Sequence, residues 1–363
     1  MRSICSLLLF VLGTVNLCMA QEVHDLIDRN YTAKIAPGVS VVVKSPDATK
    51  YYAKGLANLE DATAIDSLTT FRMASVSKQF TAMAIYQLIA AGKIDFQTPV
   101  RSILPELPAA TKDISVANFL NHSSGILDYE NLIEAARKTQ LTDFDVLEYI
   151  RSVDSLYFPP GSQFRYSNTA YCLLALIVER LTHKSYPDAI EDLIFKPLGI
   201  KGATVFPSVD ISKRAFGYHP TDNNFLFADQ SLTSSTKGDG GVYISAVDYN
   251  RWLDNRNPLF TPAYWNTLQK HKILVKDNIY YSLGWFVNYD TDGSCTVFHS
   301  GESTGFHNMV VFAPNTNKMI SIFSNRDDFQ IARLFDELAS PNNAINALPR
   351  PLFHWLNQVY MNE

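Results

Sequence analysis

Strand-like segments stand at both ends of this chain, and helix-like segments fill its middle. After a short helical segment over residues 23–29, a β-branched run occupies residues 38–43 and a second strand follows near residues 51–53. Strands return only in the last third. This order predicts an α+β fold in which one sheet is built from both ends and the helical middle packs as a second lobe. A cleft between two lobes is the natural place for a ligand.

The last third of the chain carries four predicted strands. They cover residues 282–289, 295–299, 306–313 and 318–324. Turn signals at Asp292-Gly293 and Pro314-Asn315 separate them and favour an antiparallel meander. A helix over residues 328–339 is expected next, and a segment punctuated by prolines begins at Pro341.

Two helices stand out in the middle of the chain. Residues 75–91 carry apolar side chains at helical spacing, and Gly92 is a natural stop. Residues 168–181 are almost wholly apolar. A helix without a polar face is buried on most sides, so we predict that this second helix lies in the core.

The first twenty residues have the pattern of a secretory signal peptide. Arg2 precedes an apolar stretch over residues 4–12, and the small Ala20 offers a cleavage point. We therefore predict a leader over residues 1–20, one domain over residues 21–340, a tail over residues 341–363, and a secreted or periplasmic location. The apolar stretch is shorter than the roughly 20 residues of a membrane helix, so no integral membrane segment is expected.

Charge and residue spacing exclude several function classes. The 31 basic and 36 acidic residues give a formal net charge of -5, and no run of Lys or Arg could follow phosphates, so nucleic acid is not an expected partner. The eight histidines are scattered, and we predict neither a metal nor another cofactor. Cleavage of the leader leaves Cys172 and Cys295, for which two free thiols fit as well as a disulfide.

The segment Ser75-Val76-Ser77-Lys78 places a hydroxyl and an amine three residues apart at a helix start. Both side chains then project from one face, where the amine can activate the serine as a nucleophile. Residues 234–237 match the same pattern. They run into the glycine-rich residues 238–241, which indicate a loop, so the first copy is the stronger candidate.

A second candidate motif is Tyr166-Ser167-Asn168, at the start of the predicted core helix. It offers a phenol and an amide, and a nearby lysine is expected to help the tyrosine lose its proton. The spacing alone is weak evidence. Residues 129–131, 264–266 and 360–362 share it, and an ordinary tyrosine is the alternative for each.

The third candidate motif is His299-Ser300-Gly301, where an apolar strand meets a polar turn. Its backbone is free to approach a ligand, and we expect His299 to face the cleft. Residues 301–305 also match the G-x-S-x-G nucleophile elbow, with Asp327 and His354 following in the right order. That elbow requires a strand, a turn and a helix, whereas a strand is predicted after it here.

Taken together and in this order, the three motifs resemble the signatures of the serine β-lactamase-related hydrolases, in the branch of class C β-lactamases and DD-peptidases. The resemblance covers about residues 30–335, and several connecting segments agree with it. Among them are Phe71-Arg72-Met73-Ala74, Asn121-His122-Ser123-Ser124-Gly125-Ile126, Lys196-Pro197-Leu198-Gly199-Ile200, Gly238-Asp239-Gly240-Gly241 and Ser324-Asn325-Arg326.

This resemblance implies a fold and a mechanism. The fold is a five-stranded antiparallel sheet flanked by helices and joined to an all-helical lobe. The mechanism passes through an acyl-enzyme without a cofactor: Ser75 attacks a carbonyl, Lys78 and Tyr166 move its proton, and water releases the acyl group.

The resemblance also assigns positions around the substrate. The backbone amides of Ser75 and Glu302 would form the oxyanion hole. Asn168 would hold the acyl amide of the substrate. His299 would line the strand edge beside the leaving group, together with Ser300 and Gly301.

Two residues depart from the pattern of these relatives. β-Lactamases of this branch usually have lysine where His299 stands, and a neutral imidazole attracts a carboxylate less than an ammonium does. The acidic Glu302 would repel a carboxylate or favour an amine. We therefore expect weak or no β-lactamase activity, with a preference for neutral or amine-bearing esters and amides.

Two classes of function fit these observations. The first is a secreted serine hydrolase, an esterase or D-amino-acid peptidase that acts on small molecules or short peptides, including peptidoglycan fragments. A DD-carboxypeptidase or penicillin-binding protein is the alternative within that class. The second is a non-catalytic relative that binds peptidoglycan fragments. The intact Ser75 and Lys78 pair favours the enzyme, and the sequence does not indicate an oligomeric state.

Overall fold

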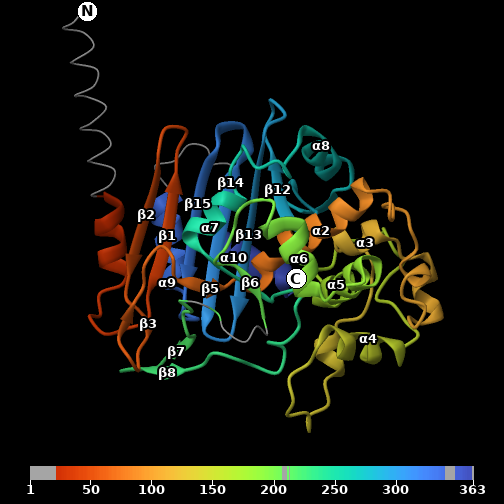
Figure 1. Cartoon of the computed structure of the whole chain (residues 1–363), viewed down its shortest axis with the longest axis horizontal. Helices are drawn as coiled ribbons and strands as arrows, with labels where there is room; N and C mark the ends of the chain where they lie inside the picture. The colour runs from red at the N-terminus through yellow and green to blue at the C-terminus, as the bar shows by residue number, and fades with distance from the viewer. Residues whose placement is uncertain (1–21, 207–210, 212, 340–347, 362–363) are drawn as a thin grey trace, which may run out of the picture.

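A single large sheet joins the two ends of the chain (Figure 1). The structure is a computed structural model, and it describes residues 22–206, 211, 213–339 and 348–361. Eight antiparallel strands lie in the order β10-β11-β12-β13-β14-β15-β1-β2. The register of β1 against β15 runs from Val39↔Ser324 to Lys44↔Met319. The predicted sheet from both termini is therefore confirmed.

Two strands of this sheet come from the N-terminal part of the chain, and the other six follow one another through its last third. Their bounds are β1 (Val39–Lys44), β2 (Thr49–Lys54), β10 (Ile273–Lys276), β11 (Ile279–Ser282), β12 (Trp285–Tyr289), β13 (Cys295–Ser303), β14 (Phe306–Ala313) and β15 (Lys318–Ser324). The predicted strand over residues 282–289 is confirmed for residues 285–289, which form β12, and its start is wrong, because Leu283 and Gly284 take positive φ angles of 48° and 81° and turn the chain between β11 and β12. The sheet thus has three more strands than the resemblance implies.

Three small sheets complete the strand structure. They are β3 (Leu56–Asn58) with β4 (Thr63–Ala64), β5 (Thr70–Arg72) with β9 (Val242–Ser245) and β6 (Thr204–Val205), and β7 (Tyr218–Pro220) with β8 (Phe225–Phe227). The sheet of β5, β9 and β6 leads directly into the first motif. The amide of Met73 donates to the carbonyl of Val242 at 2.8 Å, which fixes the backbone two residues before Ser75.

Helices from the middle of the chain gather on one side of the sheet and form the second lobe, whereas the helix over residues 22–30 lies at the opposite end, beside β2 (Figure 1). Residues 22–30 are helical, and the other helices are η1 (Ala74–Ser77), α2 (Lys78–Ala90), η2 (Val100–Ser102), η3 (Ala109–Asp113), α3 (Val116–Leu120), η4 (Tyr129–Leu132), α4 (Asp143–Arg151), α5 (Asn168–Thr182), α6 (Tyr186–Ile190), η5 (Glu191–Phe195), α7 (Ala246–Trp252), α8 (Pro262–Lys270), η6 (Pro314–Thr316), α9 (Gln330–Ala339) and α10 (Leu352–Tyr360). All residues of α5 from Thr169 to Val178 are buried, which confirms the predicted core helix.

The C-terminal helix α10 is an element that the sequence analysis did not predict. Its apolar face is buried, and the ring of Trp355 packs against Phe286 and Phe298 of the sheet at centroid distances of 5.7 and 6.1 Å. The last described residues of the chain lie where the sheet meets the helical lobe (Figure 1). This segment is therefore part of the folded domain and reaches the region of the predicted site.

Two further predictions concern the chain ends and the cysteines. The predicted signal peptide over residues 1–20 lies outside the described residues. Within the described part of the chain, no helix has the length and hydrophobicity of a bilayer span. The sequence allowed either a disulfide or two free thiols for Cys172 and Cys295. Both residues are free thiols in the structure.

The buried Asn325 links the end of β15 to three other segments. Its side-chain oxygen accepts from the Gly38 amide at 2.7 Å, and its amide donates to the carbonyls of Leu56 at 3.0 Å and Phe216 at 2.9 Å. An unpaired buried backbone group is costly, so this one side chain stabilises several loops at once.

Replacing this side chain should destabilise the fold. We expect Asn325→Ala to lower the free energy of unfolding by about 3 kcal/mol, because it leaves buried backbone groups unpaired. Urea denaturation followed by circular dichroism measures the change. Asn223→Ala, in an exposed turn, is the control and should shift stability by less than about 0.5 kcal/mol. Equal stability of the two variants would contradict this account of Asn325.

Candidate active site

Ser75 and Lys78 lie together at the start of the first buried helix. Ser75 is in the 3₁₀ turn η1, and Lys78 begins α2. The Lys78 Nζ lies 3.0 Å from the Ser75 Oγ. Ala74, immediately before Ser75, has a φ of 47°, an unfavourable conformation for a residue with a Cβ. The predicted pairing of hydroxyl and amine is therefore present, on a backbone that turns sharply at the serine.

The Lys78 side chain is fully buried and held by two further acceptors. Its Nζ lies 2.8 Å from the Asn168 Oδ1 and 3.0 Å from the carbonyl oxygen of Asp239. Desolvation lowers the pKa of Lys78 to about 8, although the negative charge of Asp239 acts in the opposite direction. A substantial neutral fraction therefore exists near neutral pH, and neutral Lys78 can accept the proton of Ser75.

Tyr166 lies over the same lysine, with its ring centroid 4.9 Å from the Lys78 Nζ. The expectation that the lysine would help this tyrosine lose its proton is wrong. Burial, followed by the charge of Tyr360, raises the pKa of Tyr166 well above its usual value, and the nearby Ser75 offsets this only in part. The buried hydroxyl makes no hydrogen bond of good geometry with the described residues. Tyr166 therefore keeps its proton, and its hydroxyl can donate this proton to a bound group.

His299 is fully buried, and it does not face the cleft as predicted. Its Nδ1 lies 2.5 Å from the carbonyl of Ser300, so this nitrogen carries the hydrogen, and its Nε2 lies 3.2 Å from the Tyr281 hydroxyl. Burial lowers the pKa of His299 to about 3, so the ring is neutral. Aromatic rings surround it because β11 and β12 continue the sheet beside β13. The sequence analysis did not predict β10 and β11 as separate strands.

Gly301 allows β13 to lie directly against η1. A Cβ at this position would lie 2.1 Å from the carbonyl oxygen of Met73 and 3.2 Å from the amide nitrogen of Val76. Only glycine tolerates such a close approach. Ser75 and Glu302 both line the same cavity.

A cavity of about 260 Å³ opens at Ser75. Asn168 and Glu302 line it, as the predictions require, whereas Lys78, Tyr166, His299, Ser300 and Gly301 are buried beneath its surface. Further side chains line it that sequence reasoning missed. These are Arg72, Tyr129, Glu130, Ser231, Thr233, Ser234, Thr236, Asp239, Ser303 and Thr304.

Glu130 is the most consequential of the missed residues. Its Oε1 accepts from the Asn168 Nδ2 at 2.8 Å, so a chain of hydrogen bonds runs from Glu130 through Asn168 and Lys78 to Ser75. Burial raises the pKa of Glu130 to about 7. The residue belongs to the triplet at residues 129–131 that repeats the tyrosine and asparagine spacing. That repeat was the only signal in the sequence.

Tyr360, from the C-terminal helix, is the second missed residue. Its hydroxyl lies 2.8 Å from the Ser300 Oγ, and its ring centroid lies 4.7 Å from that of Tyr166. Ser300 is fully buried beneath this contact. Residues 360–362 also repeat the tyrosine and asparagine spacing, but nothing in the sequence indicated that they approach Ser75.

The two competing motifs do not form active sites. Ser234 Oγ accepts from the Ser231 amide at 2.8 Å, and the Lys237 Nζ lies 3.9 Å from Glu179, so Ser234 lines the cavity without Lys237 as a partner. The proposed elbow at residues 301–305 lies in the hairpin of β13 and β14, which has no helix after the turn. Asp327 bonds to His219 at 2.9 Å rather than to His354.

One buried group within the described residues has the spacing of a metal site: Asp143, Cys172 and Asp239. The Asp143 carboxylate already accepts from the amides of Lys237 and Gly238. Burial raises the pKa of Asp143 to about 7 and that of Cys172 well above its usual value. A protonated thiol is a poor metal ligand, so this group fits a hydrogen-bonded core beneath Lys78 better than a metal centre.

Comparison with known proteins identifies the family of this chain. A sequence model of the family described as Beta-lactamase matches residues 24–338. The chain belongs to the Beta-lactamase family. This membership confirms the predicted family and its α+β fold, and it leaves α10 outside the matched region.

Two curated relatives illustrate the sequence similarity. The chain is 26% identical over 331 residues to Protein flp of Staphylococcus aureus strain MW2, covering 88% of this chain and 65% of that protein. It is 24% identical over 319 residues to Penicillin-binding protein 4* of Bacillus subtilis, covering 80% and 68%. The chain thus spans about two thirds of the length of these relatives.

Solved structures agree on the fold. A penicillin-binding protein from Bacillus halodurans superposes with a TM-score of 0.75 and 25% identity, covering 88% of this chain and 98% of that one. The D-amino acid amidase from Ochrobactrum anthropi, in complex with L-phenylalanine amide, gives a TM-score of 0.75 and 20% identity, covering 90% and 98%.

The lowered pKa of Lys78 predicts a pH dependence for the reactivity of Ser75. Only the neutral amine accepts a proton, so labelling of Ser75 by a fluorophosphonate should accelerate as the pH rises from 6 and level off above about pH 8. Lys78→Met should slow labelling by about 1,000-fold. Mass spectrometry of the labelled protein measures both rates.

The second serine and lysine pair supplies the matched control. Lys237→Met should label at the wild-type rate, because Lys237 does not contact Ser75. A rate that stays constant between pH 6 and 9, or rapid labelling of Lys78→Met, would contradict the role given to Lys78.

Proposed function

We propose that this protein is a serine hydrolase of the esterase or D-amino-acid peptidase type, which cleaves small esters or amides whose acyl part carries a free amine. The observation that carries the proposal is the buried Lys78 Nζ, 3.0 Å from the Ser75 Oγ and with a pKa of about 8. A non-catalytic binding protein has no need for this pair. The shared family supports hydrolysis, and the residues of the cavity support the substrate class.

The proton transfers follow from the two side chains beside Ser75. Ser75 Oγ attacks the carbonyl and gives its proton to neutral Lys78, while the amides of Ser75 and Glu302 stabilise the oxyanion. Tyr166 donates its hydroxyl proton to the leaving group and regains one from Lys78. Its unpartnered hydroxyl and raised pKa suit a donor. Water then attacks the carbonyl of the acyl-enzyme and gives its proton to neutral Lys78. Lys78 returns a proton to the Ser75 Oγ as the bond to the acyl group breaks.

The charges in the cavity favour an amine on the acyl part. Three carboxyls line the cavity, those of Glu130, Glu302 and Asp239. Among the residues that the structure describes, the lining contains one cationic side chain, Arg72. Two of the three Arg72 guanidinium nitrogens have no partner within the described residues. The ammonium of a substrate can pair with Glu130 despite the positive charge of Arg72. The Glu130 carboxyl is bonded to Asn168, and Asn168 is bonded to Lys78 beside Ser75.

A DD-carboxypeptidase is the second candidate, and Arg72 is the observation that favours it. Arg72 lines the cavity, its Nε and Nη1 are buried without a partner within the described residues, and a guanidinium is a natural partner for a carboxylate. The acidic Glu302 acts against such a substrate and against β-lactams, and the buried, neutral His299 supplies no cation that would offset it. We also propose that the protein is secreted or periplasmic, on the basis of the signal-peptide pattern in residues 1–20.

The preference for an amine can be measured with one substitution. Glu130→Gln keeps an oxygen for Asn168 but removes the negative charge, so we expect kcat/KM for D-aminoacyl amides to fall about 30-fold. The N-acetylated amides should change by less than about threefold. Glu134→Gln, on the exposed part of the same segment, is the control variant. An equal loss on both substrate series would indicate a structural effect and refute the amine preference.

The repulsion assigned to Glu302 gives a further test. Glu302→Gln should raise the rate of acylation by benzylpenicillin about tenfold, because the substrate carboxylate then meets a neutral group. Intact-mass spectrometry follows the adduct on Ser75. No gain in this variant would count against the electrostatic account of weak β-lactam reactivity.

The first experiment on the wild-type protein is active-site labelling. Incubation with a fluorophosphonate should add one adduct, mapped to Ser75 by peptide mass spectrometry. Efficient labelling by a β-lactam as well would favour the carboxypeptidase. An adduct on Ser303 would overturn the mechanism, and the absence of any adduct would favour the non-catalytic binding protein.

A further inference from the structure

The C-terminal helix α10 brings a side chain to the active site from outside the family region. Tyr360 ends this helix, 22 positions after the last family-matched residue, 338. Its ring lies 4.7 Å from that of Tyr166 and 6.2 Å from that of His299, centroid to centroid. Its hydroxyl is bonded to the buried Ser300 Oγ at 2.8 Å. Tyr360 therefore covers the segment of β13 that precedes Gly301.

This position corresponds to the leaving-group side of the site. If Tyr166 protonates the leaving group, that group must lie within hydrogen-bond distance of the Tyr166 hydroxyl. Tyr360 packs against the same ring, and burial raises the pKa of its own hydroxyl, so this side chain is neutral. A substituent that extends along β13 from the scissile bond would meet the Tyr360 ring.

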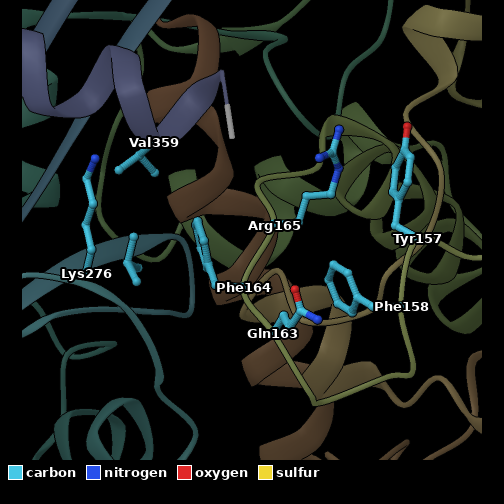
Figure 2. Close-up of a pocket in the computed structure, with 8 residues that line it drawn as sticks. Tyr157, Phe158, Gln163, Phe164, Arg165, Lys276 and Val359 are labelled. Atoms are coloured by element: carbon cyan, nitrogen blue, oxygen red, sulfur yellow. The ribbon is translucent and has the colours of Figure 1, made fainter. Parts of the chain in front are cut away.

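A second cavity lies on the other side of this helix end. It measures about 400 Å³, and Val359, the residue before Tyr360, lines it together with Phe164. Figure 2 shows Lys276 on one side of Phe164 and Arg165 on the other. Arg165 directly precedes Tyr166 in the chain, and its guanidinium forms an ion pair with Asp128 at 2.7 Å. Val359 and Tyr360 are adjacent at the end of α10, so this helix end contacts both the Tyr166 ring and the second cavity.

We propose that Tyr360 is a specificity-determining residue that limits the size of the leaving group. The proposal rests on the serine hydrolase function and adds the substrate subclass: simple amides and short esters are cleaved, whereas peptides with a bulky leaving residue are excluded. Loss of the Tyr360 ring removes the side chain that packs against Tyr166 and Ser300, so a larger leaving group gains space beside Tyr166.

Two phosphonates with the same alkyl groups test this proposal on Ser75. One expels fluoride and the other expels 4-hydroxybenzoate. In both, a bond forms between Ser75 Oγ and phosphorus as the bond from phosphorus to the leaving group breaks. The serine proton passes to Lys78, and the expelled aryloxide takes up a proton to become the phenol. The ratio of the two labelling rates reports the space for the leaving group.

In the wild-type protein, the fluoride probe should label Ser75 much faster than the aryl probe. Tyr360→Ala should raise the relative rate of the aryl probe at least about tenfold, as expected when a steric block is removed from a pocket. Tyr360→Phe keeps the ring and should retain the wild-type ratio. Tyr280→Ala, a tyrosine on β11 that does not contact the site, is the control. Thermal denaturation shows that each variant is folded.

The outcomes separate this proposal from the function on which it rests. Labelling by the fluoride probe with an unchanged ratio in Tyr360→Ala would overturn the role of Tyr360 and leave the serine hydrolase intact. If neither probe labels Ser75 in any folded variant, the hydrolase function fails, and the leaving-group limit fails with it. An equal rise in Tyr360→Ala and Tyr360→Phe would assign the effect to the hydrogen bond with Ser300 and would also overturn the steric proposal.

Discussion

Strand β13 lies directly against the 3₁₀ turn η1, and the arrangement of the site depends on this contact. Gly301 makes it possible, because any Cβ there would collide with the backbone of Met73. The contact joins the sheet to the first helix of the other lobe. It holds the nucleophile turn against β13, an interior strand of the sheet. A longer side chain at position 301 would separate the lobes at the point where Ser75 is held.

Burial then decides the chemistry of the groups around Ser75. It lowers the pKa of Lys78 toward 8 and raises that of Tyr166, so the two side chains take opposite roles. A fraction of Lys78 is neutral near neutral pH and can accept a proton, whereas Tyr166 keeps its proton. The same effect keeps His299 neutral and raises the pKa of Glu130 to about 7. Desolvation, more than any single ion pair, therefore sets the protonation states of this site.

The C-terminal helix brings a residue from outside the family-matched region against the active site. The family region supplies Ser75, Lys78, Tyr166 and the strand that carries Gly301. Helix α10 adds Tyr360 against Tyr166 and Ser300, and Trp355 anchors it on the sheet. A short extension can alter the leaving-group side of the site in this way without disturbing the nucleophile, because it packs on a sheet that is already complete.

Much of the architecture and the central pair of residues followed from the sequence alone. The periodicity of the two chain ends predicted β1, β14 and β15, the apolar run predicted α5, and the spacing of Ser75 and Lys78 on one helix fixed their contact. These are local properties, since hydrophobic period and helix geometry act over a few residues. The three ordered motifs then indicated the family.

Tertiary structure alone decided which other residues reach Ser75. Glu130 and Tyr360 lie in triplets with the same spacing as Tyr166 and Asn168, so only the packing of η4 and α10 distinguishes their places. It also buried His299, which the strand pattern had placed at the cleft, and reversed the expected effect on Tyr166. Long-range contacts and desolvation depend on how the whole chain folds, and no local pattern in the sequence encodes them.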